Sequence, residues 1–356
     1  MQKYYIFVIN PGGGSSKIAY FVNNELIKRE TLRHPPHELL SYSRTIDQLS
    51  YRYRAIKKAV EEWNIKELNA VVGRGGPFKP LKSGTYRVND IMINDILKGR
   101  VLADHPSNLG ALLAQRLANT FNTNAYIVDP VSVDEFIPES RISGMPELER
   151  KSLSHALNMK MVMKLYAEKQ KTDITKLNLI VVHLGTGISI GAMRKGQQID
   201  VNNANDGGPF SPQRTGSLPV TQLVKLCFSG RFSKEEMLNK ITRQGGFLAY
   251  LGTDMLSDVE KMVNKGDKQA EIVYNAMIIQ IAKEIGAMAA VLEGDVDAIL
   301  ITGGMAHFPD FVANIKKKVS FITNQFFEYP GEHELEALAF GAYRVLIGKE
   351  EVKTYE

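Results

Sequence analysis

Two glycine-rich segments of this chain carry groups that suit phosphate binding. The first, "FVINPGGGSSKIAYF" (residues 7–21), places three glycines, two serines and Lys17 between two apolar stretches. Consecutive glycines leave backbone N–H groups accessible and tolerate positive φ, so such a loop can wrap an anion. It is not a P-loop, because the G-x-x-x-x-G-K-[ST] spacing is missing and a strand is expected after it. Taken alone, the pattern describes a tight hairpin turn equally well.

The second segment, "HLGTGIS" (183–189), has the same setting in the other half of the chain. A third glycine turn, "LITGGMAH" (300–307), also follows an apolar run directly. Two hairpin loops, one in each half, could grip one polyphosphate, and the third turn could lie under a nucleotide. Three such turns favour a nucleotide-binding site over three unrelated turns.

Two acidic residues lie where they could serve phosphate chemistry. Asp129 ends the apolar stretch "YIVDP", and ligands of α/β proteins collect at strand ends. A carboxylate there could hold Mg2+, which takes few protein carboxylates and keeps several waters. Alternatively, Asp129 caps the turn before Pro130. Glu334, in "GEHELEALA", could be only a first-turn helix acid favoured by the helix dipole.

Two arginines lie in glycine-rich loops. Arg214 is part of "NDGGPFSPQRTGSLP" (205–219), a loop long enough to be functional, and Arg74 is part of "VVGRGGP". Either guanidinium could clamp a transferring phosphoryl group, or could simply be solvated. The histidines nearest to these elements are His105, His155 and His183, and their spacing does not suggest zinc.

The elements that must position these groups repeat along the chain. Residues 4–32 read as strand, glycine hairpin, strand, turn and strand, and residues 177–203 repeat that order. The sequence therefore predicts an α/β protein with two halves built on one plan. Further strands are expected within 68–80, 124–130 and 296–304, and helices over 38–63, 107–121, 150–170, 268–292 and 333–348.

Composition limits the class of protein. The chain has 356 residues, of which 44% are hydrophobic and 23% charged, as in a soluble globular protein of about two domains. The net charge of +5 is spread out, and anionic small molecules explain it as well as nucleic acid does. The basic and aromatic segment "YRYRAIKKAVEEW" reads as an amphipathic helix with a solvated face.

Two further features indicate the cellular compartment of the protein. The single cysteine, Cys227, excludes an intrachain disulfide and fits a reducing cytosol. The sequence shows no signal peptide, and its most apolar helical stretch, 272–292, is interrupted by Gln280, Lys283 and Glu284. We therefore expect no membrane span.

Together these segments resemble the butyrate kinases of the acetokinase family. The motifs run in order over nearly the whole chain, and "VGRGG", "FSPQRTG" and "AYLGTDM" indicate the butyrate kinase branch. The remaining motifs are "INPGGGSSK", "DHPSNLGALLA", "YIVDPVSVDEF", "RKSLSHALNMK", "VVHLGTGISI", "IDVNNANDGG" and "ILITGG". The resemblance implies two duplicated RNase H-like domains with mixed β-sheets flanked by helices and a cleft between them. We expect residues 1–150, joined by the C-terminal helix 334–356, to form one domain, and residues 151–333 to form the nucleotide-binding domain.

The resemblance implies the reversible reaction of ATP and a short-chain carboxylate to ADP and an acyl phosphate, with Mg2+ and direct in-line transfer. It further implies a cytoplasmic homodimer or higher homo-oligomer, with no nucleic acid or membrane as partner. Two alternatives stay open. One is another small-metabolite kinase on the same fold, and the other is a sensor that binds ATP without acyl transfer.

The resemblance also implies roles for single residues. Arg214, Asp129, His155 and Arg74 would act in catalysis, and Asp129 and Glu334 would hold Mg2+. The phosphate loops and the adenosine side would comprise Asn10, Gly13, Ser15, Lys17, His183, Gly185, Thr186, Gly187, Asp254, Gly303 and Gly304.

The chain departs from family patterns at a few positions. Gly13 and Gly14 stand where typical butyrate kinases have Ser and Thr, so two hydroxyl donors are missing from the first loop. Lys151 stands at the first histidine of the acetate kinase pattern H-G-T-S-H, of which His155 keeps the second. Leu256 replaces an arginine on the adenine side. The last two differences argue against a plain acetate kinase.

Overall fold

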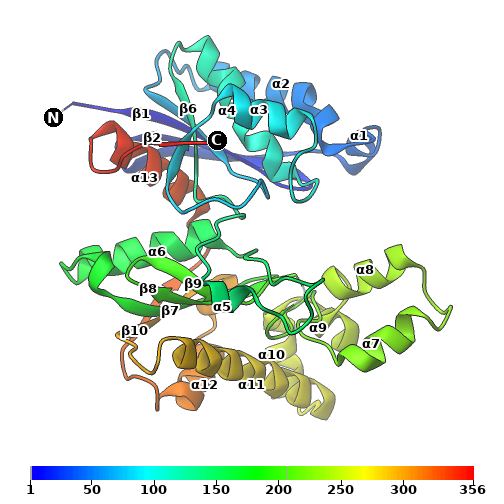
Figure 1. Cartoon of the computed structure of the whole chain (residues 1–356). Helices are drawn as coiled ribbons and strands as arrows, with labels where there is room; N and C mark the ends of the chain where they lie inside the picture. Colours follow the sequence, from blue (N-terminus) through cyan, green and yellow to red (C-terminus); the bar gives the residue numbers. More distant parts are fainter. Residues whose placement is uncertain (1, 206) are drawn as a thin grey trace. The chain divides into compact units, whose positions relative to one another are not determined.

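In the computed structural model, which describes residues 2–205 and 207–356, the chain divides into two units (Figure 1). Unit 1 comprises the chain up to Asp134 together with His333–Glu356, and unit 2 comprises Glu135–Glu332. The expected boundaries at 150/151 and 333/334 differ from these. Residues 135–150 lie in unit 2 because this segment is fastened there by buried and half-buried ion pairs, including that of Glu135 with Lys160 at 2.6 Å.

Unit 1 contains a seven-stranded mixed sheet in the order β12-β5-β6-β4-β1-β2-β3. The strands β1, β2 and β3 form an antiparallel meander, and β1, β4 and β6 are parallel neighbours. The bounds are β1 (Tyr5–Pro11), β2 (Ser15–Val22), β3 (Glu25–Arg33), β4 (Ala70–Arg74), β5 (Thr85–Arg87), β6 (Asn124–Val128) and β12 (Lys353–Thr354).

Helices cover this sheet. The alternation of apolar residues along β1 places Phe7 and Ile9 in a core cluster with Ile56 and Leu113 of α2 and α4. The C-terminal helix α13 packs on β1, β4 and β6, away from α2, α3 and α4 (Figure 1). The helices are α1 (Pro36–Leu39), η1 (Thr45–Gln48), α2 (Leu49–Glu62), α3 (Asp90–Leu97), η2 (Pro106–Asn108), α4 (Leu109–Thr120) and α13 (Glu334–Leu346).

The predicted helix over 38–63 is wrong in its first part, where α1 and η1 replace a continuous helix. The Ser41 hydroxyl donates to the carbonyl of Glu38 at 2.6 Å. Asp47 accepts from the backbone N–H of Arg44 at 3.2 Å and from its guanidinium at 3.0 Å. Such local side-chain hydrogen bonds compete with a continuous helix.

A close backbone approach fixes the end of β4 against α4. A Cβ on Gly73 would lie 2.0 Å from the carbonyl oxygen of Gly110, and a Cβ on Gly110 would lie 2.2 Å from that of Arg74. Only a pair of glycines permits this contact. It holds Arg74, the last residue of β4, in a fixed place.

Unit 2 repeats the plan with a five-stranded sheet in the order β11-β10-β7-β8-β9. Again three antiparallel strands come first, and β10 then pairs in parallel with β7, as β4 does with β1. The predicted repeat of 4–32 at 177–203 is confirmed. The strands are β7 (Asn178–Leu184), β8 (Ile188–Arg194), β9 (Gln197–Val201), β10 (Ala298–Gly303) and β11 (Phe326–Pro330).

The two faces of this sheet have separate cores. Leu179 and Val181 pack with Met159 of α6, whereas Ile180 and Val182 face a larger cluster with α11 and α12. The helices are α5 (Pro138–Arg141), α6 (Ala156–Lys169), η3 (Ile174–Lys176), α7 (Val220–Cys227), α8 (Lys234–Thr242), α9 (Gly246–Leu251), α10 (Leu256–Asn264), α11 (Lys268–Val291), η4 (Gly304–His307) and α12 (Pro309–Val319).

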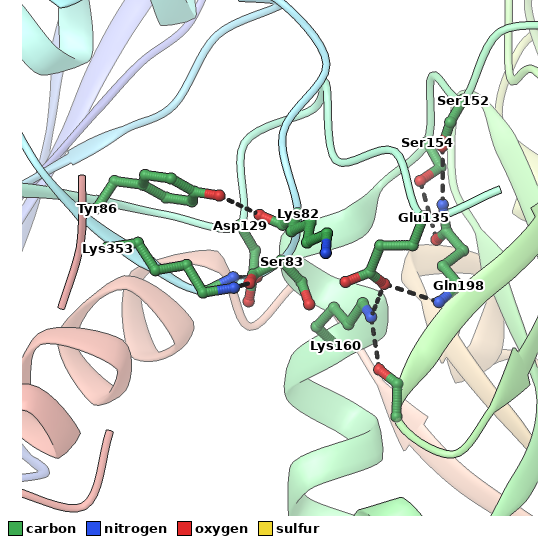
Figure 2. Close-up of polar contacts among 12 residues, drawn as sticks. Lys82, Ser83, Tyr86, Asp129, Glu135, Ser152, Ser154, Lys160, Gln198 and Lys353 are labelled. Atoms are coloured by element: carbon green, nitrogen blue, oxygen red, sulfur yellow. Dashed lines mark hydrogen bonds and ion pairs between the residues drawn. The ribbon is translucent and has the colours of Figure 1, made fainter. Parts of the chain in front are cut away.

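The predicted helix over 150–170 begins only at Ala156. Two serines ahead of it bond to a distant strand instead. Ser154 donates to the Gln198 side-chain oxygen at 3.2 Å, and the Gln198 amide donates to Ser152 at 3.1 Å (Figure 2). These bonds hold 152–155 in an irregular conformation.

The helix α11 is long and apolar enough, by length and composition alone, to cross a membrane. Its buried residues include Val273, Met277, Ile281 and Ile285, which belong to the large hydrophobic cluster of unit 2. Packing against the sheet therefore accounts for its apolar character.

Candidate functional site

In unit 1, three of the predicted residues stand in a row at the carboxyl ends of parallel strands. Ile9 pairs with Gly73, which places Asn10 beside Arg74, and Arg74 pairs with Val128, the residue before Asp129. Neighbouring strands lie about 4.8 Å apart. The sheet edge therefore presents an amide, a guanidinium and a carboxylate, all buried.

Glu334 joins this row from the first turn of α13. Its Oε2 accepts a hydrogen bond from the Asn10 amide at 2.7 Å, and its Oε1 lies 3.4 Å from Nη1 of Arg74. The Arg74 side chain is 7% exposed, so this ion pair is shielded from solvent screening. The predicted residues Asn10, Arg74 and Glu334 thus form one connected cluster.

Asp129 is held by its own turn. It has φ +37°, its Oδ1 accepts the Gly84 N–H at 2.7 Å, and its N–H donates to the Gly84 carbonyl at 3.1 Å. The loop before Gly84 is fastened in turn, because Tyr86 donates to the Lys82 carbonyl and Lys353 donates to that of Ser83 (Figure 2). The left-handed backbone of a non-glycine residue is a strained arrangement of the kind found at functional sites.

These carboxylates fit a magnesium ion that is shared with a substrate. Within residues 2–205 and 207–356, no group of three or more His, Cys, Asp or Glu side chains is arranged to hold a metal. Mg2+ in phosphoryl-transfer enzymes is bound through one or two carboxylates, with waters and substrate phosphates as its other ligands. Asp129 and Glu334 offer this hard oxygen chemistry at one sheet edge.

The first glycine loop, residues 12–14, joins β1 to β2. The Gly12 N–H donates to the Ser15 carbonyl at 2.8 Å, which closes the turn. Gly13 and Gly14 are exposed, and a Cβ on either would meet no heavy atom within 4 Å. The loop is thus an open stretch of backbone.

The base of this loop carries the polar groups that the sequence predicts. Asn10 and Lys17 are direct partners in the antiparallel register, and Ser15 begins β2. Lys17 is exposed whereas Asn10 is buried. The two side chains therefore lie on the same face of the hairpin, where the amide is buried and the cation reaches solvent.

In unit 2, the second glycine loop, residues 185–187, lies against two histidines. The rings of His155 and His183 are stacked at 4.0 Å between centroids. Nδ1 of His155 lies 2.9 Å from Ser189 Oγ, and Nδ1 of His183 lies 3.2 Å from Asn158 Oδ1. Each ring is thus oriented through its Nδ1.

Arg214 lies directly on this loop. A Cβ added to Gly187 would come within 2.3 Å of Nη1 of Arg214 and 3.3 Å of the His155 ring. Nη1 also donates to the Ala204 carbonyl at 2.8 Å. Burial lowers the pKa of the Arg214 guanidinium, but an arginine stays charged at neutral pH. A fixed cation and two imidazoles therefore border one glycine turn.

The Arg214 loop is held by residues of the predicted nucleotide side. Asp254 accepts a hydrogen bond from the Gln213 amide at 2.6 Å, and Ser211 donates to the Thr186 carbonyl at 2.5 Å. Asp254 therefore acts, within this unit, on the chain segment that carries Arg214. The predicted loop over 205–219 includes residue 206, which lies outside the described residues.

The third glycine turn abuts the second. Gly303 has φ +93°, and a Cβ there would lie 2.3 Å from the carbonyl oxygen of Leu184, the last residue of β7. Gly304 begins η4 and is open to its surroundings. The predicted loop residues Gly185, Thr186, Gly187, Gly303 and Gly304 are thus neighbours at one sheet edge.

Several residues that support the site were missed from the sequence. Asn158 contacts both His183 and Thr302, at 3.2 and 3.0 Å, and lies one helical turn after His155. Ser211 and Gln213 flank Arg214 in the quoted loop. The spacing of Asn158 from His155 on one helix face was the available signal.

Two cavities flank the Arg214 loop within unit 2. A polar cavity of about 550 Å³ is lined by Lys151, Asn203, Gly208 and Glu284, among others. An apolar cavity of about 480 Å³ is lined by residues such as Phe210 and Tyr250. Ser217 borders both.

Comparison with known proteins places this geometry in a family. Residues 148–322 match the model of the acetokinase family. Butyrate kinase 2 of Clostridium acetobutylicum is 50% identical over 361 aligned positions that cover 100% of both chains. A probable butyrate kinase 2 of Caldanaerobacter subterraneus subsp. tengcongensis is 48% identical over 98% of this chain and 99% of its own.

A solved structure shows the same fold at low identity. The acetate kinase of Porphyromonas gingivalis superimposes with a TM-score of 0.77 over 97% of this chain and 100% of its own, at 16% identity. The predicted fold class, two duplicated α/β domains with mixed sheets flanked by helices, is confirmed. A relative that shares half of its residues from end to end excludes a merely local match, and this chain therefore belongs to the acetokinase family.

Proposed function

We propose that this chain is a butyrate kinase, which transfers the γ-phosphoryl group of ATP reversibly to the carboxylate of butyrate or a related short-chain acid. The observation that carries the proposal is the Arg214 guanidinium, which is half-buried and lies against Gly187 and beside His155. A fixed cation on a glycine turn suits stabilisation of a transferring phosphoryl group. The full-length relatives named as butyrate kinases support the choice of acid.

The reaction needs positioning and charge neutralisation rather than proton transfer. A carboxylate oxygen of the acid forms the new bond to the γ-phosphorus while the bond from that phosphorus to the bridging oxygen of ADP breaks. Carboxylic acids of this kind are ionised at neutral pH, so no general base has to remove a proton. In-line displacement therefore yields the acyl phosphate and ADP directly.

In this proposal, the groups of each unit have separate roles. In unit 2, Arg214 and His155 neutralise the oxygens of the transferring group, and the turns with Gly187 and Gly303 bind the nucleotide phosphates. In unit 1, Asn10 and Arg74 orient the anionic acceptor. The hydrogen bonds and the ion pair given above support these roles.

Lys17 and the first glycine loop bind phosphoryl oxygens in this proposal. Asp129 and Glu334 would hold Mg2+, which offsets phosphate charge when it is bound. Asp254 keeps the Arg214 loop in place through Gln213. We also propose that the enzyme works in the cytoplasm as a homodimer or higher homo-oligomer, without nucleic acid or membrane as partner.

An acyl hydroxamate assay tests the proposal. Purified protein is incubated with ATP, Mg2+ and hydroxylamine and with straight and branched acids from C2 to C6. We expect most hydroxamate with butyrate or a branched C4 or C5 acid. Hydroxamate formation that is best with acetate, or absent with every acid although MgATP binds, would refute the proposed activity.

A further inference from the structure

A fully buried arginine lies behind the first glycine loop. Arg52, on α2, is 0% exposed, although the sequence of this helix predicts a solvated basic face. The neighbouring Arg54, Lys57 and Lys58 do lie in solvent. Arg52 is therefore the exception on its helix and needs its own explanation.

Among residues 2–205 and 207–356, this buried guanidinium has no carboxylate as a hydrogen-bond or ion-pair partner. In the part of the chain that the structure describes, its contacts are all with neutral groups. Burial lowers the pKa of Arg52 to about 10, which leaves it charged at neutral pH. A buried charge without a counter-ion is costly, so its retention calls for a compensating anion.

The guanidinium fastens the carbonyl side of the loop. Nη2 donates to the Gly13 carbonyl at 2.9 Å, and Nη1 donates to the Ser15 carbonyl at 3.1 Å and to Ser16 Oγ at 3.2 Å. Gln48 holds the guanidinium itself, since its side-chain oxygen accepts from Nε at 3.0 Å and from Nη2 at 2.9 Å. Each of the three guanidinium nitrogens of Arg52 thus donates to an acceptor.

This anchoring decides where the Gly14 amide points. A peptide unit is planar and trans, so its N–H points opposite to its carbonyl. With the Gly13 carbonyl on Arg52, the Gly14 N–H points away from the protein interior. Among the described residues, neither Gly13 nor Gly14 donates its N–H to a protein acceptor, and both are exposed. Successive backbone N–H groups that are free of protein acceptors can form an anion-binding concavity.

We propose that Arg52 is a positioning residue for phosphoryl binding, which orients the amides of the first glycine loop and provides the buried positive charge that a bound phosphoryl group balances. Arg52 does not touch the substrate, and its effect passes through the Gly13–Gly14 peptide. This role rests on the proposed function and extends it, because it names the group that makes the exposed loop selective for an anion.

The competing explanation is that Arg52 has a purely structural role in the core of unit 1. If Arg52 only filled space and bonded to carbonyls, a neutral side chain with hydrogen-bonding capacity would affect stability but not phosphoryl binding. A charge-and-orientation role predicts instead that substrate kinetics change in the folded enzyme, because the interaction acts through a region of low dielectric constant.

Three variants of the full chain separate these explanations. Arg52→Gln removes the charge, Arg52→Lys keeps the charge but loses the fork, and Arg54→Gln makes the same chemical change on the exposed side of α2. The measurement is kcat/KM for butyryl phosphate with ADP, taken well below each variant's melting temperature. We expect a loss on the order of 10- to 100-fold for Arg52→Gln, a smaller loss for Arg52→Lys, and a change within about twofold for Arg54→Gln.

The outcomes are decisive in both directions. A folded Arg52→Gln enzyme with the kcat/KM of Arg54→Gln would overturn the proposal, as would equal losses in Arg52→Lys and Arg52→Gln. If Arg52→Gln does not fold, Arg52→Lys alone must raise KM for butyryl phosphate more than Arg54→Gln does.

A binding measurement keeps this test separate from the proposed activity. Inorganic pyrophosphate is added to each variant, and the rise in melting temperature is recorded. We expect pyrophosphate to raise the melting temperature of the wild type and of Arg54→Gln by equal amounts, and that of Arg52→Gln by less. If the wild type forms no acyl hydroxamate but this order holds, the proposed activity fails while the role of Arg52 stands. Equal gains in all variants would refute the role of Arg52.

Discussion

The two glycine loops follow the same kind of strand and open the same kind of hairpin, but their glycines serve different purposes. In the first loop, side chains on Gly13 or Gly14 would meet nothing within 4 Å. In the second, a Cβ on Gly187 would collide with Arg214, and one on Gly185 would lie 3.0 Å from the His183 ring. The first loop exposes its backbone to solvent. In the second loop, the missing Cβ atoms leave room for the side chains of Arg214 and His183.

Because of this difference, different atoms of the two loops are available to bind a phosphoryl group. The first loop can bind an anion only through its amides, because its glycines bring no side chain and its carbonyls are held by Arg52 and by the His34 N–H. The second loop has a guanidinium and two imidazoles against it. Substitutions should therefore affect the two loops very differently.

The largest effect is expected from Arg214→Gln, which removes the cation from the second loop. Loss of a charged contact made in the transition state costs a few kcal/mol, or roughly 100-fold or more in kcat. The variant keeps a polar side chain that can still donate to the Ala204 carbonyl. Steady-state kcat in the hydroxamate assay is the measurement.

Arg243→Gln is the matched control, because Arg243 is an exposed arginine of the same unit at the end of α8. We expect its kcat to stay within about twofold of the wild type. Near-full turnover by Arg214→Gln would contradict the role of this cation and, with it, the view that the second loop works through side chains.

A smaller but related effect is expected from Gly187→Ala. The added methyl would displace the guanidinium at the end of the Arg214 side chain from its present position. The hydrogen bond to Ala204 would be lost at a cost of about 1 kcal/mol in stability. Misplacement of the guanidinium should lower kcat by about 10- to 100-fold, which kinetics and thermal unfolding of the same sample would reveal.

The control for Gly187→Ala is Gly286→Ala in α11, where a Cβ has nothing within 4 Å. Replacing a helical glycine there should stabilise unit 2 by about 0.5–1 kcal/mol and leave kcat unchanged. If Gly187→Ala kept full kcat, the close packing of Arg214 on this loop would have no catalytic meaning.

The third prediction concerns the support of the first loop. Nε2 of His34 lies 2.9 Å from Ser16 Oγ, and burial, followed by the charge of Arg52, lowers the pKa of His34 to about 4, against an opposing influence of Glu38. The unfolded chain protonates this residue near pH 6.5. The stabilisation is therefore complete above about pH 6.5 and declines as the pH falls toward 4, by up to about 1.4 kcal/mol per pH unit.

Urea unfolding at pH 7 and pH 4.5 measures this dependence. His34→Gln, which keeps a hydrogen-bonding side chain beside Ser16, should lose about 2 kcal/mol less than the wild type over this interval. His37→Gln, at an exposed histidine of the same segment, should behave like the wild type. Equal slopes for all three proteins would show that His34 is not held neutral behind the loop.

Much of the fold could be predicted because it depends on local patterns. Apolar runs that end in glycine marked β1, β7 and β10, and the repeat of the hairpin order predicted two similar sheets. The late start of α6 could not be predicted, because Ser152 and Ser154 bond to Gln198, more than forty positions away. Hydrogen bonds between distant segments leave no trace in local periodicity.

The candidate site, too, could be predicted only where it depends on local sequence patterns. The register of β1, β4 and β6 aligns Asn10, Arg74 and Asp129, and strand ends were the right place to search. The burial of Arg52 could not be predicted, because an arginine in an amphipathic helix is expected to be solvated. Its burial depends on the loop carbonyls of another element, which only the tertiary structure brings to it.

The smallest effect is expected from the double substitution Gly13→Ser and Gly14→Thr. Neither glycine has a left-handed φ and both have open space, so side chains should be tolerated and stability should rise by a few tenths to about 1 kcal/mol. The new hydroxyls add donors beside the exposed amides, and KM for butyryl phosphate should fall by no more than a few-fold. A loss of activity of tenfold or more would mean that the loop must adopt a glycine-only conformation when substrate binds. The first loop would then resemble the second in requiring its glycines, and the contrast between open backbone and side-chain clearance would hold only for the free enzyme.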